Sequence, residues 1–458
     1  MTDAPAAKTS TREDTGREAQ KAGATVFDKR PPLRLKDCYL FFFPLVLMVE
    51  LNMISKSAIH AFLARTDTPS VTLAAFNSAF TFYFALTSAT EITALLCLSY
   101  LKSRADVGRL IGFMIVLLLV PFALALTIAL TPLGNEIFGG WFGLSAQGQV
   151  EARATMGLLA LSVPVLILRG IAFALLMLNR KTIIITFSTL VRLASLAVSL
   201  AILPTVLEGA AIGAGALVLC MASETVFAWC FAHKHFSALP VSRAGQESYL
   251  RYWGFSWPLI INTSAEMGVI LTISLFLGRL SNAELALAAF GVVHGLISLL
   301  MGPMRNLTQT AQTLVNQRGD VRVISVFTGH LVIIFTLLAV VLFHTPMRDI
   351  VLRGIMGLTP ELAAYSEPAL TLSFVMAGFW SCTALFRGLL AKARTTKSLA
   401  ASGVLRVATV AIAGFIGLSH PEINGALLGV GAWIFSYAVE ASISAWRLGK
   451  LGWYTAEA

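Results

Sequence analysis

The sequence has little charge and none of the short motifs that soluble enzymes use. Only 13% of its 458 residues are charged, whereas 57% are hydrophobic; a soluble domain carries about 25% charged residues. So few charges cannot cover a water-exposed surface, and we expect an all-α integral membrane protein in a lipid bilayer. No glycine-rich loop ends in Lys-Ser or Lys-Thr, which excludes a P-loop ATPase, and neither a metal-binding His pair nor a nucleophile elbow is present. We expect neither enzymatic activity nor a cofactor or metal ion.

Cysteine is scarce, and the start of the chain lacks a signal peptide. The spacing of the five cysteines is typical of neither a zinc site nor a disulfide framework. We interpret them as small core residues: Cys38, Cys97, Cys220, Cys230 and Cys382. No apolar run follows a short basic start within residues 1–35, and their polar composition predicts a disordered cytoplasmic tail.

Apolar segments fill the remainder of the chain. Each is long enough for the roughly 20 residues of a spanning helix. We predict twelve transmembrane helices, at residues 36–62, 71–100, 107–130, 154–178, 183–205, 209–232, 251–278, 284–314, 321–343, 363–390, 395–418 and 423–447.

The basic residues indicate the orientation of these helices. If the N-terminus is cytoplasmic, most lysines and arginines fall in inner segments, as cytoplasmic loops favour. The outer loops then hold only Arg65, Arg153, Arg279, Arg348 and Arg353. This bias predicts a multi-pass protein of the cell (inner) membrane with both termini in the cytoplasm. It also explains the net charge of +10 without a nucleic-acid partner.

The chain matches itself at an offset of 214 residues. Leu73-Ala74-Ala75-Phe76 aligns with Leu287-Ala288-Ala289-Phe290, and Arg104-Ala105-Asp106-Val107 with Arg318-Gly319-Asp320-Val321. Six helices per half is an even number, so the halves are parallel repeats. We predict two six-helix lobes with a cytoplasmic linker and a cleft between them. The expected boundaries are 36–232 for the N-lobe, 233–250 for the linker, 251–447 for the C-lobe and 448–458 for a C-terminal tail.

Two pairs of intramembrane charges recur in both halves. Arg192 aligns with Arg406 and, after a two-residue slip, Glu224 aligns with Glu440. Their depths in neighbouring antiparallel helices predict one structural ion pair per lobe, Arg192–Glu224 and Arg406–Glu440.

Other intramembrane charges break this symmetry. Glu50 and Lys56 lie on helix 1, Glu91 on helix 2 and Arg169 on helix 4, whereas Glu266 lies on helix 7 and His294 and Arg305 on helix 8. A scaffold does not need such asymmetry, whereas a substrate or coupling-ion site does. Plainer interpretations stay open. Lys56 would reach outward to the interface, His294 would be a core histidine, and Glu91 and Arg305 would pair with each other.

Two prolines mark the first helix of each lobe. Pro44 and Pro258 occupy equivalent positions and predict kinks, which free backbone carbonyls. Beyond Pro258, the polar run Asn262-Thr263-Ser264 precedes Glu266 in mid-membrane. We predict a substrate or coupling site at Asn262, Ser264 and Glu266, with helix–helix hydrogen bonding as the alternative.

These features resemble the multidrug/oligosaccharidyl-lipid/polysaccharide exporter superfamily, known for its MATE members. Within it the chain is most similar to the progressive ankylosis protein group. Trp257-Pro258-Leu259, Arg279, Gly302-Pro303-Met304-Arg305, Val404-Leu405-Arg406-Val407 and the run Gly425 to Gly431 carry this similarity over about residues 36–447. The resemblance implies alternating access and export of anions such as ATP, citrate or pyrophosphate.

Several functions stay open at this point. The first is secondary-active export of a small charged, organic anionic solute by a monomer. Arg305 and Lys56, with Arg169 as a further candidate, would face the cleft and neutralise the charge of the substrate. The second is a proton- or sodium-coupled cation or drug antiporter in which Glu50 and Glu266 exchange substrate for protons. Glu50 and Lys56 on helix 1 do not match the family's acidic pattern, which leaves both signs of substrate charge open. The third is a lipid-linked sugar flippase, although those relatives usually have fourteen helices. A scaffold without transport would need no intramembrane charges.

Overall fold

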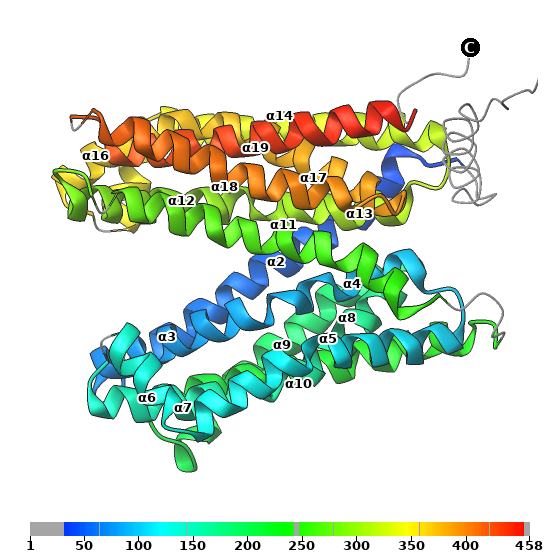
Figure 1. Cartoon of the computed structure of the whole chain (residues 1–458), viewed down its shortest axis with the longest axis horizontal. Helices are drawn as coiled ribbons and strands as arrows, with labels where there is room; N and C mark the ends of the chain where they lie inside the picture. Colours follow the sequence, from blue (N-terminus) through cyan, green and yellow to red (C-terminus); the bar gives the residue numbers. More distant parts are fainter. Residues whose placement is uncertain are drawn as a thin grey trace, which may run out of the picture.

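The computed structural model describes residues 32–63, 65–142, 144–241, 247–277, 279–356, 358–420 and 422–452, and these form helices and no strands (Figure 1). Most of the predicted N-terminal tail, 1–35, and part of the C-terminal tail, 448–458, lie outside these residues. The first half contains α2 (Leu35–Leu63), α3 (Pro69–Thr87), η1 (Ser88–Glu91), α4 (Ile92–Tyr100), α5 (Arg104–Leu130), α6 (Leu133–Asn135), η2 (Glu136–Trp141), α7 (Ala146–Ala160), α8 (Ser162–Leu178), α9 (Thr182–Ile202), η3 (Leu203–Thr205) and α10 (Ala210–Ser237).

The second half repeats this order. It contains α11 (Tyr249–Leu277), α12 (Ala283–Met301), η4 (Gly302–Asn306), α13 (Leu307–Leu314), α14 (Arg318–His344), α15 (Met347–Asp349), η5 (Ile350–Ile355), α16 (Pro360–Leu372), η6 (Ser373–Val375), α17 (Met376–Lys392), α18 (Lys397–Leu418) and α19 (Gly425–Lys450).

The helices match the predicted spans closely. Within the described residues, 11 helical stretches are long and apolar enough to cross a membrane. The remaining predicted span, 284–314, is formed by α12, η4 and α13. The largest difference is in the fourth span, which was expected from residue 154 but begins at Ala146. Its first turns are polar, and the Ser145 hydroxyl caps them by accepting from the Gly148 backbone, so hydropathy does not reveal this start.

The two halves form two helical bundles that meet along a seam (Figure 1). We call residues 32–241 the first lobe and residues 247–452 the second lobe. In the first lobe α10 packs against α7, α8 and α9; in the second, α19 packs against α16, α17 and α18. Each lobe thus has its own helical core, as parallel repeats require.

The 214-residue repeat extends to irregular backbone. The 3₁₀ turns η1 and η4 begin at Ser88 and Gly302, and the π-helical turns η2 and η5 begin at Glu136 and Ile350. Arg180 and Arg394, also 214 residues apart, share a left-handed backbone with φ of 56° and 55°. Such local irregularities depend on details of packing, so their recurrence shows that the halves are copies in structure as well as in sequence.

Both prolines lie inside long helices, and near each of them a threonine hydroxyl donates a hydrogen bond to a backbone carbonyl of that helix. Pro44 cannot donate to the Leu40 carbonyl, and the Thr182 hydroxyl donates to it instead at 3.4 Å. In the second lobe, which carries Pro258, the Thr396 hydroxyl donates to the Phe255 carbonyl at 2.9 Å. The two threonines are equivalent in the repeat, so both first helices are tied to the next-to-last helix of their lobe.

The lobes are joined toward one end of the molecule. Figure 1 shows the start of α2 and the end of α19 at that end, which we call the termini end. The labels α6 and α16 lie at the opposite end, which we call the far end. Hydrogen bonds across the seam run from Gln312 Nε2 to the Leu95 carbonyl at 2.7 Å and from Asn306 Nδ2 to the Leu45 carbonyl at 3.1 Å.

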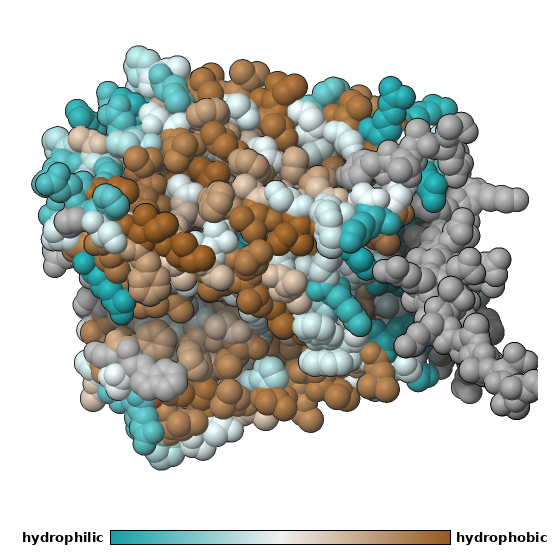
Figure 2. All heavy atoms as spheres, turned by 45° about the horizontal axis from the view of Figure 1, so that its top comes forward, coloured by the Kyte–Doolittle hydropathy of each residue, from teal (hydrophilic) through white to brown (hydrophobic). Residues whose placement is uncertain are grey.

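Toward the far end the lobes diverge. In Figure 1, α3 and α12 splay apart there, whereas α4 and α13 meet at the termini end. Figure 2 shows a broad apolar band around the middle of the molecule, polar residues at its ends and a hollow between the lobes. The apolar band suits a lipid environment, and the conformation is a V with its opening at the far end.

Candidate functional site

Five charged side chains in the second lobe contact one another in a row, which we call the ion chain. Its first members are Arg305 in η4 and Glu266 on α11, whose Nη2 and Oε1 atoms are 3.0 Å apart. The second carboxylate oxygen of Glu266 lies 3.7 Å from Nη1 of Arg387 on α17. Glu266 therefore sits between two arginines, and Arg305 pairs with it rather than with Glu91.

The ion chain continues into the core of the lobe through Glu440 on α19. Arg387 donates from Nε and Nη2 to the two oxygens of Glu440, both at 2.7 Å, a bidentate geometry. Arg406 Nη1 lies 2.9 Å from the same carboxylate, and Asn262 Nδ2 donates to it at 3.0 Å. Arg406 and Glu440 are fully buried, so this end of the chain holds four helices together.

The first lobe contains a shorter version. Glu224 on α10 lies 2.9 Å from Arg169 Nε and 3.5 Å from Arg192 Nη1, and it accepts from the Thr189 hydroxyl at 2.9 Å. Arg192 also donates to Asn52 Oδ1 at 2.8 Å. Both predicted pairs, Arg192–Glu224 and Arg406–Glu440, are thus present as contacts, each within a triad of two arginines and one glutamate.

Arg169 was wrongly assigned to the asymmetric charges. It lies on α8 and contacts Glu224, just as Arg387 on α17 contacts Glu440. The fixed register hid this equivalence because the two arginines are about one helical turn out of step, with Arg169 aligning with Thr383 at the 214-residue offset. The same slip explains why sequence reasoning missed Arg387.

Arg305 is the exposed end of the second-lobe chain. Its side chain is 59% exposed, whereas those of Glu266 and Arg387 are 20% and 15% exposed. It lies in the 3₁₀ break η4, which contacts α2 of the first lobe at the seam. Three arginines and two glutamates make up the chain, so one positive charge is in excess, and the accessible member is a cation.

Aromatic side chains surround this end. The Trp380 ring centroid lies 5.9 Å from Cζ of Arg305, and Trp433 lies 5.7 Å from Trp380 and 4.8 Å from the His294 ring. The indole Nε1 of buried Trp433 has no hydrogen-bond partner among the described residues. In the described part of the chain, His294 is thus connected to Trp380 only through Trp433, and its Nε2 lies 3.5 Å from the Ser298 hydroxyl.

The other expected site residues do not contact the ion chain. Glu91 ends η1, the repeat equivalent of η4, and is exposed. Glu50 on α2 is half-buried and forms no ion pair within the described residues. Ser264 is exposed, two positions from Asn262 on a helix, and so lies on the opposite side of α11. The side chain of Lys56 lies outside the described part.

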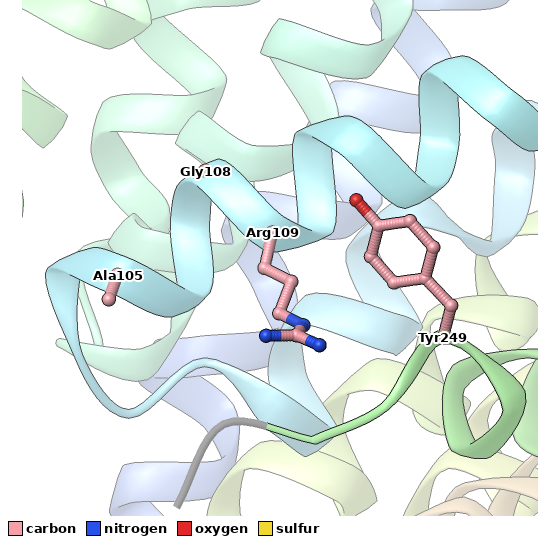
Figure 3. Close-up of a pocket in the computed structure, with 4 residues that line it drawn as sticks. All are labelled: Ala105, Gly108, Arg109 and Tyr249. Carbon is pink, nitrogen blue, oxygen red and sulfur yellow. The ribbon is translucent and has the colours of Figure 1, made fainter. Parts of the chain in front are cut away.

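Cavities also lie away from the ion chain. One, of about 440 Å³, is formed by Ala105, Gly108, Arg109 and Tyr249, with Arg109 from α5 facing the Tyr249 ring across the space (Figure 3). It contains no member of the ion chain. A larger one at the termini end, of about 1100 Å³, spans both lobes.

Comparison with solved structures identifies the architecture. The chain is similar to a MATE transporter from Vibrio cholerae in its bent form, with a TM-score of 0.72 at 14% identity over 95% of this chain and 100% of that one. A MOP superfamily transporter from Pyrococcus furiosus gives 0.69 at 12% identity, covering 91% and 96% of the two chains. The fold is that of the MATE transporters. An outward-facing multidrug resistance MATE transporter also matches, with a TM-score of 0.67 at 12% identity over 92% and 97% of the chains.

The MATE-like fold was expected from the sequence and is confirmed. No family model and no curated protein matches the chain by sequence. The structures named above lend no support to the progressive ankylosis group, which stays a prediction. At these identities the likeness establishes the architecture, two parallel six-helix lobes, and the substrate has to be argued from the residues of this chain.

Proposed function

We propose that this protein is a secondary-active transporter that exports a small organic anion by alternating access of its two lobes. It would work as a monomer in the cell (inner) membrane with both termini in the cytoplasm. The MATE-like fold, the V-shaped conformation and the intramembrane charges support transport. The distribution of basic residues supports the orientation, because the loops and helix ends at the termini end hold most of the lysines and arginines in the described part of the chain.

The exposed guanidinium of Arg305 carries the anion assignment. A positive charge in mid-membrane is costly, and it persists only where a partner or water stabilises it. Glu266 stabilises it on one side at 3.0 Å, while 59% of the side chain stays open at the seam. ATP, citrate and pyrophosphate are the candidates to test first.

The test is anion flux in proteoliposomes. Arg305→Ala should lower the uptake or efflux of the transported anion by roughly tenfold to a hundredfold, since a charged hydrogen bond contributes about 1.5–3 kcal/mol. Arg353→Ala removes an exposed arginine at the far end and is the matched control. Equal flux in wild-type protein and Arg305→Ala would refute the assignment of Arg305.

A proton- or sodium-coupled cation antiporter is the second candidate, and Glu50 is the observation that favours it. This carboxylate lies midway along α2 without an ion-pair partner in the described residues, as a coupling group requires. If it carries the function, Glu50→Gln and Glu266→Gln should abolish pH-dependent efflux of a cationic dye. Anion flux would then stay at background in the wild type and in every variant, including Arg305→Ala.

A further inference from the structure

The cavity at the termini end forms a basic pocket between the lobes. Its walls come from the ends of α4 and α8 in the first lobe and from α11, α17, α18 and α19 in the second. With a volume of about 1100 Å³ it is larger than the cavity beside Tyr249. Six basic residues line it: Lys102, Arg251, Lys392, Arg394, Lys397 and Arg447.

Among the described residues, Glu247 is the acidic side chain that pairs with this basic pocket. Glu247 pairs with Arg251 at 2.6 Å and with Arg394 at 3.3 Å. The Lys392 ammonium donates to the neutral Asn316 side chain at 3.2 Å. Lys102, Lys397 and Arg447 form no ion pair within the described ranges, so the basic pocket has several charges available for an anion.

The excess of positive charge is specific to the second lobe. At the repeat offset of 214, Lys392 and Lys397 align with Leu178 and Ile183. At the slipped offset that aligns Glu440 with Glu224, Arg447 aligns with Phe231. The copies in the first lobe are all apolar, so the shared scaffold does not require these charges.

Apolar residues share the walls with the basic ones. Leu98, Phe255, Ile443 and Trp446 line the basic pocket. Trp446 is 60% exposed, and the Lys450 ammonium lies 3.7 Å from its ring centroid. An exposed tryptophan beside a lysine at the end of a spanning helix is typical of the interface between membrane and water. The ligand that suits such walls carries both a phosphate group and an acyl chain.

We propose that the basic pocket binds the headgroup of an anionic phospholipid from the leaflet at the termini end. The phosphate would contact Lys102 on the first lobe and Lys392, Lys397 and Arg447 on the second, with the acyl chains along Trp446. A basic cavity between membrane helices at the cytoplasmic side matches this chemistry. Because the ligand touches both lobes where they meet, bound lipid would stabilise the conformation that is open at the far end. The proposal does not depend on what the protein transports.

Native mass spectrometry of the purified full-length protein tests lipid binding directly. Phosphatidylglycerol and phosphatidylcholine are titrated separately, and inorganic phosphate and pyrophosphate serve as soluble competitors. The test variant combines Lys392→Leu, Lys397→Ile and Arg447→Phe, the residues that the first lobe carries. We expect the wild type to prefer phosphatidylglycerol and the variant to bind it on the order of 100-fold more weakly, because each basic residue near anionic lipid contributes about fivefold.

The matched control removes as much charge from the far end. It combines Arg65→Gln, Arg279→Gln and Arg353→Gln, three exposed arginines, and should bind phosphatidylglycerol like the wild type. Lys397→Ile alone changes one exposed side chain and gives a smaller loss if the triple variant fails to fold. Equal phosphatidylglycerol binding by the test and control variants overturns the proposal. Binding of phosphate or pyrophosphate without any preference for phosphatidylglycerol also overturns it, because the ligand would then be a soluble anion.

Discussion

Glu440 and Glu224 each hold two arginines inside a lobe. In the second lobe, Arg387 and Arg406 both contact the fully buried Glu440 carboxylate, at 2.7 and 2.9 Å. Two buried guanidinium groups around one carboxylate are stable only while the negative charge is present, because an uncompensated buried charge is costly. These residues therefore determine whether each lobe holds together.

Replacing Glu440 should destabilise the protein strongly. Glu440→Gln keeps the side-chain shape but leaves the fully buried Arg406 without a carboxylate and Arg387 with only the longer contact to Glu266 at 3.7 Å, which costs about 3–5 kcal/mol. We expect a large drop in the thermal unfolding temperature in detergent micelles, and Glu224→Gln should behave similarly. Glu361→Gln alters an exposed glutamate in the first turn of α16 and should leave the unfolding temperature unchanged. Equal unfolding temperatures for Glu440→Gln and Glu361→Gln would contradict a structural role for the triad.

Individual residues were predictable where the same residue type recurs at an equivalent place in both halves. Arg192, Glu224, Arg406 and Glu440 could be paired because both members recur, the glutamates after a two-residue slip. Arg387 could not, since side-chain length lets an arginine reach the same carboxylate from a neighbouring turn. The partner of Arg305 was also beyond the sequence, because Glu91 and Glu266 lay at comparable depths and only the packing of α11 against its neighbours decides between them.

At the scale of elements, the turn between α17 and α18 links the lobes. The Arg394 guanidinium donates to the Ser99 carbonyl of α4 at 2.7 Å and lies 4.1 Å from the centroid of the Tyr100 ring. Its repeat equivalent, Arg180, forms one ion pair among the described residues, with Asp37 of the same lobe at 3.9 Å. One copy of this turn therefore reaches across the seam, while the other stays within its lobe.

Arg394→Ala should weaken the seam at the termini end. Loss of its contacts to Ser99 and Tyr100 should shift the population toward a conformation closed at the far end. Spin labels at Asp67 and Asn282, exposed at the far ends of the two lobes, would report this as a shorter distance in double electron–electron resonance. Arg180→Ala is the control and should leave the distance distribution unchanged. The same distribution in Arg394→Ala as in the wild type would show that other contacts hold the seam.

Elements were largely predictable, because hydropathy and the repeat both mark the spans. Polar helical turns were not, as the early start of α7 at Ala146 shows. The 3₁₀ breaks η1 and η4 also escaped, although Gly302-Pro303 opens one of them. The sequence Ser88-Ala89-Thr90-Glu91 of the other contains no helix-breaking residue, so its geometry follows from packing rather than from local preference.

At the scale of the whole molecule, the two lobes and their parallel arrangement follow from the duplication. The sequence did not predict the side to which the V opens, because the opening depends on the sum of weak contacts along the seam. Those contacts gather near α4, α13 and the turn after α17. The orientation proposed from basic residues then means that the cleft faces outward in this conformation.

Cysteine labelling tests that orientation. In a background without the native cysteines, a cysteine in place of Arg353 should react in intact cells with a maleimide that cannot cross membranes. A cysteine in place of Val241, which is 71% exposed near the linker, should react only after the cells are permeabilised. The reverse pattern would place the termini outside and the cleft on the cytoplasmic side.

The left-handed turns at Arg180 and Arg394 have an evolutionary consequence. A non-glycine residue in this conformation costs about 1–3 kcal/mol, which glycine would avoid. Both copies nevertheless carry arginine with φ near 55°. The contacts of the Arg394 guanidinium across the seam stabilise the structure enough to offset this cost. The longer ion pair of Arg180 with Asp37 stabilises it less. Position 180 is therefore free to drift toward glycine or asparagine among descendants of this gene, while position 394 is constrained.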